Sequence, residues 1–395
     1  MYAVYTSYTG AVIARLRLFY FLYYAGVGTF LGYFGPYLRG LGFTGEQIGA
    51  VTFAQAAVSS PAALVWASVA DRLGTPSRTL SICAVGTLVA ISGLPFARTP
   101  LQMGLVLALS SAFSGPLVPL ADSITVRAAG ALYARTRLWG SVGFVATAQG
   151  LGLLLALRGD RPADRSMPFA YLACAIGYAA VAQGFPSVEA HPDRPHWRDG
   201  WALLRSPALL LLLVICAVHW AACAPYHLMF GVLVRDGGLP SSVTGAGLAL
   251  GVLAEVGALF AFPALSRRLP LRALFAAAFL GSAVRWALLA HARGPAQLVL
   301  LQSLHGLTFG LWWCCAVEAM QRAVPARLRA TGQAIFSAVV FGAGNAAGYA
   351  LAGAGYDRFG SAGPLFTCAA IAELLPLLLL LLPASGRAIS AKPEA

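Results

Sequence analysis

The sequence predicts an all-α membrane protein with twelve transmembrane helices in two pseudo-symmetric halves of six helices each. Hydrophobic residues make up 59% of the 395 residues and charged residues only 10%, whereas about one-quarter of a soluble domain is charged. Apolar stretches of the ~20 residues that cross a bilayer recur along the whole chain. One polar stretch, 187–206, divides these apolar stretches into six and six.

The apolar stretches give the limits of each predicted span. In the N-terminal half, 1–186, the spans are 16–38, 45–70, 78–97, 101–125, 131–157 and 168–185. In the C-terminal half, 207–395, they are 207–234, 243–265, 272–292, 296–320, 330–354 and 363–383. The polar stretch 187–206 is the expected cytoplasmic linker, and its tryptophans favour a short interfacial helix.

A faint internal repeat supports the division into halves. Arg72 in ADRLG corresponds to Arg268 in SRRLP, and Asp122 corresponds to Glu318 at the same offset of 196 residues. Two six-helix halves related by duplication are typical of transporters, whose substrate sites lie between the halves near the membrane midplane.

The basic residues predict the orientation of the chain. With both termini placed in the cytoplasm, the cytoplasmic segments hold 18 arginines and lysines and the outer segments hold 8, as the positive-inside rule requires. The net charge of +13 therefore reflects topology, and we expect no nucleic-acid partner. The Ala-, Leu- and Arg-rich usage indicates a bacterium, so we expect a monomer in the inner cell membrane.

Three ionisable residues lie inside consecutive spans of the second half. Glu255 and Arg285 are equidistant from Pro270 in one predicted turn, and Arg285 and His305 are equidistant from Pro295 in the next. Residues placed in this way share one depth, and charges at mid-bilayer depth cost about 2.5–3.5 kcal/mol each. We expect the three to face a water-filled cavity and to couple protonation to transport. The alternative is a structural Glu–Arg pair with a packed histidine.

The first half holds a similar pair. Asp122 and Arg137 are centred on the turn at Ala129 and Gly130, so they are expected to face each other. The planar guanidinium of Arg137 suits a carboxylate or a vicinal diol. The alternative is a salt bridge at the cytoplasmic edge.

Other polar and aromatic residues are candidates for the substrate cavity. Tyr33 and Tyr37 belong to an aromatic-rich first span, Gln55 lies in the second, and His219 and Tyr226 flank Pro225 in the seventh. Helix packing is the competing explanation for the aromatic residues, and Glu373 and Asn345 are equally consistent with function and with packing. The seven cysteines lack metal-ligand spacing, so we expect no metal and no cofactor other than protons.

The chain resembles the major facilitator superfamily, in the branch of lactose permease and the phenylpropionate permeases. Asp71-Arg72-Leu-Gly74 with Arg78 is similar to the superfamily's loop after the second helix, which implies a conformational switch. Arg135-Thr-Arg-Leu-Trp-Gly-Ser-Val-Gly143 is similar to the branch's fifth helix. This similarity implies that Arg137 contacts the substrate and pairs with Asp122.

The same resemblance extends to the second half. Arg285 and His305 match charged positions of lactose permease, and the segment ending in Glu255 resembles the phenylpropionate-permease eighth helix. Thr308 stands where lactose permease has a proton-accepting acid, which leaves Glu255 and His305 as the expected proton carriers. Phe144 stands where lactose permease stacks a sugar on tryptophan.

Together these features predict a secondary active transporter that imports a small organic solute by alternating access, with protons as the expected coupling ion. The solute classes are aromatic carboxylates, sugars and nucleosides. A drug or metabolite efflux transporter of the same fold is the alternative. An intramembrane enzyme is a remote alternative because no HExxH, paired-aspartate or nucleophile motif lies in a span, and a non-transporting receptor is another.

Overall fold

The computed structural model describes residues 2–73, 75–185, 203–325 and 328–383. The N-terminal half comprises α1 (Tyr2–Phe30), α2 (Phe34–Gly40), α3 (Gly45–Leu73), α4 (Pro76–Ile91), α5 (Pro100–Ser114), α6 (Leu117–Ala129), η1 (Gly130–Leu132), α7 (Tyr133–Leu157) and α8 (Ser166–Ala182). The described part of the polar linker begins at Leu203, so its predicted interfacial helix lies mostly outside the described residues.

The described elements of the C-terminal half are also all helical. Its elements are α10 (Pro207–Ala222), α11 (Ala224–Asp236), α12 (Ser241–Arg268), α13 (Leu271–His291), α14 (Pro295–Leu300), η2 (Leu301–Leu304), η3 (Gly306–Leu311), α15 (Trp312–Ala323), α16 (Arg329–Phe336), η5 (Ser337–Gly344), α17 (Asn345–Phe359), α18 (Gly363–Ala372) and α19 (Leu374–Leu379).

The helices correspond to the twelve predicted spans. Eight stretches are long and apolar enough to cross a membrane, and three shorter apolar helices begin at Pro76, Ser166 and Gly363. One of the eight, Pro100–Leu157, is 58 residues long and holds the fourth and fifth predicted spans. The all-helical membrane fold predicted from the sequence is therefore confirmed.

Several spans are broken where the sequence removes or redirects backbone hydrogen bonds. The first span breaks after Phe30, where Gly32 adopts a φ of +82° that glycine tolerates best. The seventh breaks at Cys223, just before Pro225, and proline has no N–H to donate to the helix. In the tenth and eleventh spans, η3 and η5 are π-helical segments, whose wider turn displaces the ordinary hydrogen bonds.

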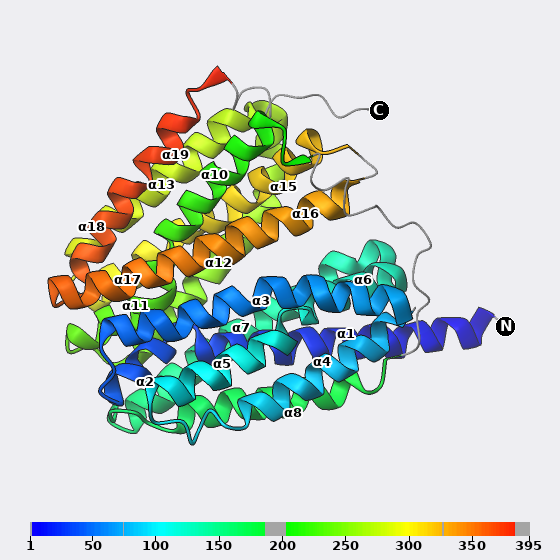
Figure 1. Ribbon diagram of the computed structural model, residues 1–395, viewed down its shortest axis with the longest axis horizontal. Coiled ribbons are helices and arrows are strands. Elements are labelled where there is room, and N and C mark those ends of the chain that lie inside the picture. Colours follow the sequence, from blue (N-terminus) through cyan, green and yellow to red (C-terminus); the bar gives the residue numbers. More distant parts are fainter. Residues whose placement is uncertain (1, 74, 186–202, 326–327, 384–395) are drawn as a thin grey trace.

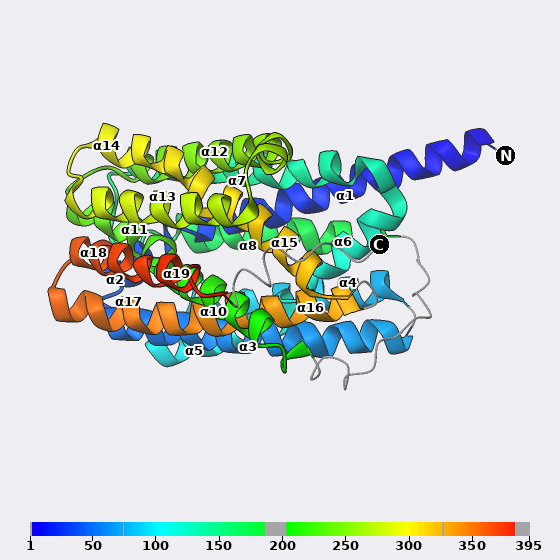
Figure 2. The same cartoon turned by 90° about the horizontal axis from the view of Figure 1, so that it is seen from above.

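The two halves pack side by side as separate bundles (Figure 1). Corresponding helices begin about 196 residues apart, for example α3 at Gly45 and α12 at Ser241, and α7 at Tyr133 and α16 at Arg329. Two seams join the halves. The α7–α12 seam lies at one edge of the interface and the α3–α17 seam at the other (Figure 2).

Two aspartates tie the halves together at one end, which we call the closed end. Asp357 of α17 accepts the backbone N–H groups of Gly45 and Glu46 at 2.7 Å each, at the start of α3. Asp160, after α7, accepts the N–H of Ser241 at the start of α12 at 3.2 Å. Each carboxylate thus caps a helix of the opposite half, where an anion is favourable.

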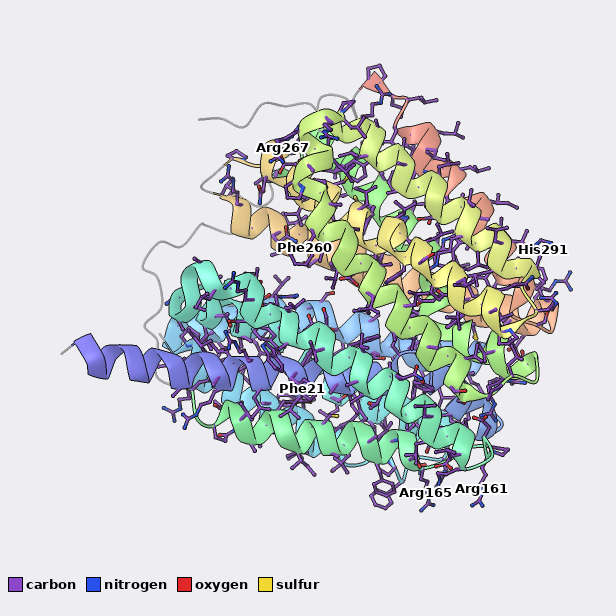
Figure 3. All side chains as sticks on the ribbon, turned by 180° about the vertical axis from the view of Figure 1, so that it is seen from behind. Phe21, Arg161, Arg165, Phe260, Arg267 and His291 are labelled. Carbon is purple, nitrogen blue, oxygen red and sulfur yellow. The ribbon has the colours of Figure 1, made fainter. Side chains whose placement is uncertain are left out.

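The bundles diverge from the closed end toward the end at which α1 begins (Figure 1). Arg161, Arg165 and His291 lie at the closed end, and Arg267 lies at the divergent end (Figure 3). Arg161 and Arg165 are among the basic residues that the positive-inside count assigns to the outer side, and Arg267 is among those that it assigns to the cytoplasm. Large apolar side chains such as Phe260, 76% exposed, cover the outer faces, as expected for contact with lipid.

Candidate functional site

The first-half pair meets as the sequence predicts. Arg137 Nε lies 3.2 Å from Asp122 Oδ1, and the two side chains are 38% and 27% exposed. Tyr20 donates to Asp122 at 2.6 Å and Arg137 Nη2 donates to the Tyr24 hydroxyl at 3.1 Å. The two tyrosines, one turn apart on α1, were not predicted as partners, although their i, i+4 spacing marks one helix face.

The second-half cluster also forms at one depth. His305 lies between the other two residues, with Nδ1 3.0 Å from Arg285 Nη1 and Nε2 4.0 Å from Glu255 Oε2. Arginine only donates hydrogen bonds, so His305 Nδ1 accepts and its remaining ring proton points from Nε2 toward Glu255. The predicted proximity is confirmed, with the histidine as the bridge between carboxylate and guanidinium.

Arg285 is held firmly in its buried position. Its side chain is fully buried, and it donates to Gln302 Oε1. The rings of Tyr226 and Trp286 lie 4.3 and 4.5 Å from its guanidinium carbon, a cation–π arrangement that stabilises a desolvated cation. Tyr226, predicted to touch substrate, lies here against Arg285.

The two clusters face each other across the halves. Arg137 belongs to α7 and Glu255 belongs to α12, and these two helices pack together at one of the two seams between the halves. The side chain of Glu255 is 20% exposed and that of His305 is 13% exposed. This acid and this imidazole are therefore partly accessible at the surface of the protein, whereas the side chain of Arg285 is fully buried.

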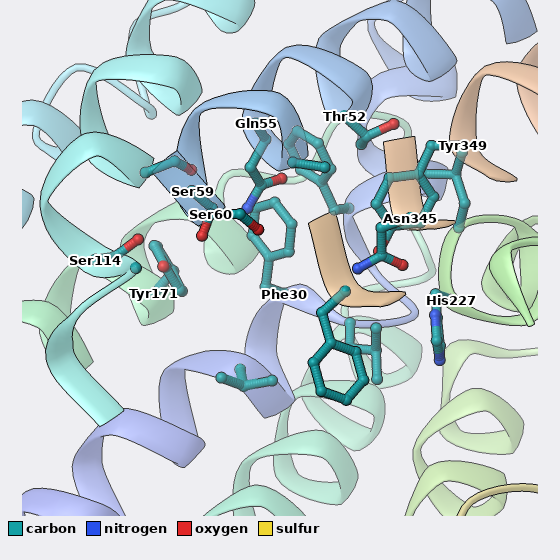
Figure 4. A pocket seen from close by; sticks show the side chains of 18 of the residues that line it. Phe30, Thr52, Gln55, Ser59, Ser60, Ser114, Tyr171, His227, Asn345 and Tyr349 are labelled. Carbon is teal, nitrogen blue, oxygen red and sulfur yellow. The ribbon is translucent and has the colours of Figure 1, made fainter. Parts of the chain in front are cut away.

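A cavity of about 330 Å³ lies between the halves, and we call it the inter-half cavity. Its N-terminal wall presents hydroxyls and an amide, and its C-terminal wall presents an imidazole, an amide and an aromatic hydroxyl (Figure 4). The labelled lining residues are Phe30, Thr52, Gln55, Ser59, Ser60, Ser114, Tyr171, His227, Asn345 and Tyr349. Of the predicted substrate contacts, Gln55 lies in this wall.

Other predicted substrate contacts lie elsewhere. Tyr33 is buried and donates to the Ala148 carbonyl, and Tyr37 and Phe144 are buried in the hydrophobic core. The aromatic spacing of the first span could not separate these packing residues from Phe30, because the break after Phe30 changes the face that each residue presents.

His219, also predicted to contact substrate, lies in a buried network. Its Nδ1 is 2.9 Å from Glu373 Oε2, its Nε2 is 2.9 Å from the Thr308 carbonyl, and Cys223 Sγ lies 3.8 Å from Nε2. The ligand atoms of His219, Cys223 and Glu373 lie within 4.8 Å of one another. Both ring nitrogens are already hydrogen bonded, so the arrangement is a hydrogen-bond network rather than an open coordination site.

Serines of the cavity wall were missed by the sequence analysis. Ser59 and Ser60 precede Pro61 inside α3, and Ser114 ends α5. A run of small hydroxyl residues inside an apolar span was the available signal.

The predicted switch loop is only partly described. Arg72 and Arg78 are exposed at the ends of α3 and α4, whereas Gly74 and the side chain of Asp71 lie outside the described residues.

Paired helical halves with charged clusters and a cavity between them define a membrane transporter. The sequence matches the MFS_1-like family over residues 13–367. The chain therefore belongs to this family of the major facilitator superfamily.

Two similar proteins have names that refer to different solutes. The chain is 29% identical over 362 residues to a protein described as a probable 3-phenylpropionic acid transporter of Escherichia coli (strain K12), covering 87% of this chain and 91% of the relative. It is 30% identical over 338 residues to a maltose permease of Geobacillus stearothermophilus, covering 83% of each.

Solved structures share the fold. The nucleoside transporter NupG superposes with a TM-score of 0.81 at 17% identity, covering 94% of this chain and 99% of NupG. A bacterial homologue of the human lysosomal transporter Spinster, in an inward-facing conformation, superposes with a TM-score of 0.69 at 13% identity, covering 97% of each chain.

Proposed function

We propose that this protein imports a small uncharged solute that carries hydroxyl groups and a ring, of the sugar or nucleoside class, together with protons. The inter-half cavity carries this proposal, because hydroxyls, two amides and aromatic rings line it from both halves. Such a lining pairs neutral hydroxyl groups and stacks on a ring. The lining does not favour export of apolar drugs, because an apolar solute would leave these polar groups without hydrogen-bond partners, which costs free energy.

Alternating access is the expected mechanism. On the orientation that the arginines predict, the closed end faces outward, so the structure corresponds to an inward-facing state. Solute that reaches Gln55 of one half and Asn345 of the other would draw the two walls together. The halves would then rock about the α3–α17 and α7–α12 seams, opening the closed end.

The charged clusters are the proposed site of coupling. Glu255 and His305 are partly exposed and form a relay with the buried Arg285. A proton taken up by Glu255 would remove a negative charge from α12, and α12 packs against α7, the helix that carries the cation Arg137 in the opposite half. Proton binding would therefore alter the force between the halves, and this is what coupling requires.

An aromatic carboxylate is a second candidate solute. Arg137 is 38% exposed, and its neighbour on α1, Tyr24, adjoins Tyr23 in the cavity wall. A carboxylate at Arg137 with its ring among the cavity aromatics fits these positions. The relative described as a 3-phenylpropionic acid transporter supports this alternative.

Uptake into proteoliposomes separates the two candidates. Labelled maltose, uridine and 3-phenylpropionate are offered to vesicles with and without protein. We expect saturable uptake of maltose or uridine, with Gln55→Ala raising KM about tenfold, the cost of one hydrogen bond of about 1.4 kcal/mol. Gln321→Ala, an exposed amide on α15, is the control. Uptake of 3-phenylpropionate alone would reject the neutral solute and favour the carboxylate.

A further inference from the structure

Glu373 interrupts the last span, between α18 and α19, and takes no part in the cavity or in the Arg285 cluster. It is fully buried, as is its partner His219. Its Oε2 lies 2.9 Å from His219 Nδ1, and its Oε1 accepts the indole N–H of Trp286 at 3.2 Å. An ionisable residue inside a membrane span costs free energy, and such residues usually have a function. We therefore asked what the hydrogen-bonded Glu373 does.

The hydrogen bonds fix the number of protons in the pair. His219 Nε2 lies 2.9 Å from the Thr308 carbonyl, and a carbonyl only accepts, so Nε2 carries a proton. The contact between Nδ1 and Glu373 then needs one more proton, held either by the imidazole or by the carboxyl. Both forms leave the pair neutral. Removing this proton would set the imidazole lone pair against a buried carboxylate, a strongly unfavourable state.

The helices that contact the His219–Glu373 pair are irregular close to it. Thr308 belongs to η3, the π-helical segment Gly306–Leu311, and such segments occur often at functional sites. His219 lies one turn before the break at Cys223, and Glu373 itself forms the break between α18 and α19. Four spans therefore meet at the pair, three of them at irregular points.

Other titratable and charged groups surround the pair. Cys223 Sγ lies 3.8 Å from His219 Nε2, and Arg285 stacks on Trp286, whose N–H reaches Glu373. His227, in the wall of the inter-half cavity, lies 5.0 Å from the ring of Trp220. Arg285 in turn contacts His305. Trp286 and Arg285 of α13 thus link the pair to His305 and the Glu255 cluster. Trp220, next to His219, links it to His227 of α11 in the cavity wall.

We propose that the His219–Glu373 pair is a second proton-binding site, which holds one proton while the four spans stay packed and releases it when they separate. The inference rests on the proposed proton coupling. Glu255 and His305 would exchange protons with water, whereas the buried pair would keep its proton through one conformation of the cycle.

Glu373→Gln tests this assignment. The glutamine oxygen can accept from Trp286 and its amide can donate to His219 Nδ1, so the side chain imitates the permanently protonated acid. The variant is reconstituted in proteoliposomes with uridine and maltose as labelled probes. We expect solute exchange at the wild-type rate, and accumulation under an imposed pH gradient no higher than in wild type treated with a protonophore.

Two further variants make the outcome specific. Glu318→Gln removes a carboxylate that pairs with Arg322 at 2.8 Å on α15, and it should leave gradient-driven accumulation unchanged. Glu373→Asp keeps a titratable group and should retain part of the accumulation, and it serves also if the glutamine variant fails to fold. A purely structural role predicts that exchange and accumulation fall together in both Glu373 variants.

Each outcome gives a decision. Gradient-driven accumulation by wild type that persists in Glu373→Gln overturns the inference and leaves the proposed function intact. Wild-type uptake that ignores both the gradient and the protonophore overturns the proposed proton coupling, and the second proton site with it.

Discussion

At the residue scale, facing positions across helical hairpins could be predicted from the sequence because depth follows directly from helix rise. Asp122 meets Arg137, and His305 meets both Arg285 and Glu255. Hydrogen-bond partners on distant spans could not be predicted in this way. The pairing of His219 with Glu373 joins residues 154 positions apart, and only the arrangement of whole helices brings them together.

Arg137→Lys tests the role of the first-half cluster. An ammonium is a point charge and cannot contact Asp122 and the Tyr24 hydroxyl through separate nitrogens of one plane. We expect uptake to fall about ten- to hundredfold, the equivalent of one hydrogen bond to a charged group. The ion pair is partly exposed, so unfolding free energy should change by no more than about 1 kcal/mol. Uptake kinetics beside thermal unfolding measure both. Normal uptake by this variant would reduce Arg137 to an edge salt bridge.

At the element scale, the predicted spans agree with the helices, but the break after Phe30 and the π-helical segments were not predicted. Apolar length sets where a span lies, whereas a break depends on where backbone groups find partners in neighbouring helices. This is why Tyr33 and His219 were assigned to the cavity. Close contacts between helices can be predicted more directly from the sequence, because small residues such as glycine allow two helix backbones to approach each other.

The contact between α1 and α7 can be tested at Gly143. A Cβ there would lie 2.1 Å from the Phe21 carbonyl oxygen, so one helix must shift to accommodate it. We expect Gly143→Ala to lower the unfolding free energy by about 1–3 kcal/mol, the usual cost of overpacking. Gly150→Ala on the same helix is the matched control, since nothing lies within 4 Å of its Cβ position. Thermal unfolding in detergent compares them, and equal melting temperatures would show that the α1–α7 contact is loose.

At the scale of the whole molecule, the 196-residue repeat predicted from Arg72 and Arg268 has a counterpart at the closed end. Asp160 caps α12 and Asp357 caps α3, so each half contributes one carboxylate to a helix of the other. Neither aspartate could be singled out from the sequence, because both follow spans in short polar loops and their partners are backbone groups. The predicted boundary at 187–206 remains a prediction.

Removing both caps should favour opening of the closed end. Asp160→Ala with Asp357→Ala eliminates two helix caps, each contributing about 1 kcal/mol, so the closed state should lose about 2 kcal/mol relative to the open state. Spin labels at Arg161 and Arg293, both exposed, should report longer distances in this variant. Asp164→Ala is the control, because Asp164 bonds Arg158 and Ser166 within its own half. Unchanged distances in the double variant would assign closure to helix packing alone.

Orientation in the membrane is tested separately. Cysteines placed at Arg161 and Arg293 in a cysteine-free background should react with an impermeant reagent added outside intact cells, and one placed at Arg194 only after permeabilisation. The reverse pattern would place the closed end in the cytoplasm.

The most direct test of proton-coupled import is the movement of protons when solute alone supplies the driving force. Proteoliposomes with an internal pH-sensitive dye and a clamped membrane potential receive external uridine or maltose, with no pH gradient imposed. The account predicts acidification of the lumen that follows solute entry in wild type and is absent in Glu255→Gln, although solute exchange continues in that variant. Solute entry that leaves the internal pH of wild-type vesicles unchanged would contradict it.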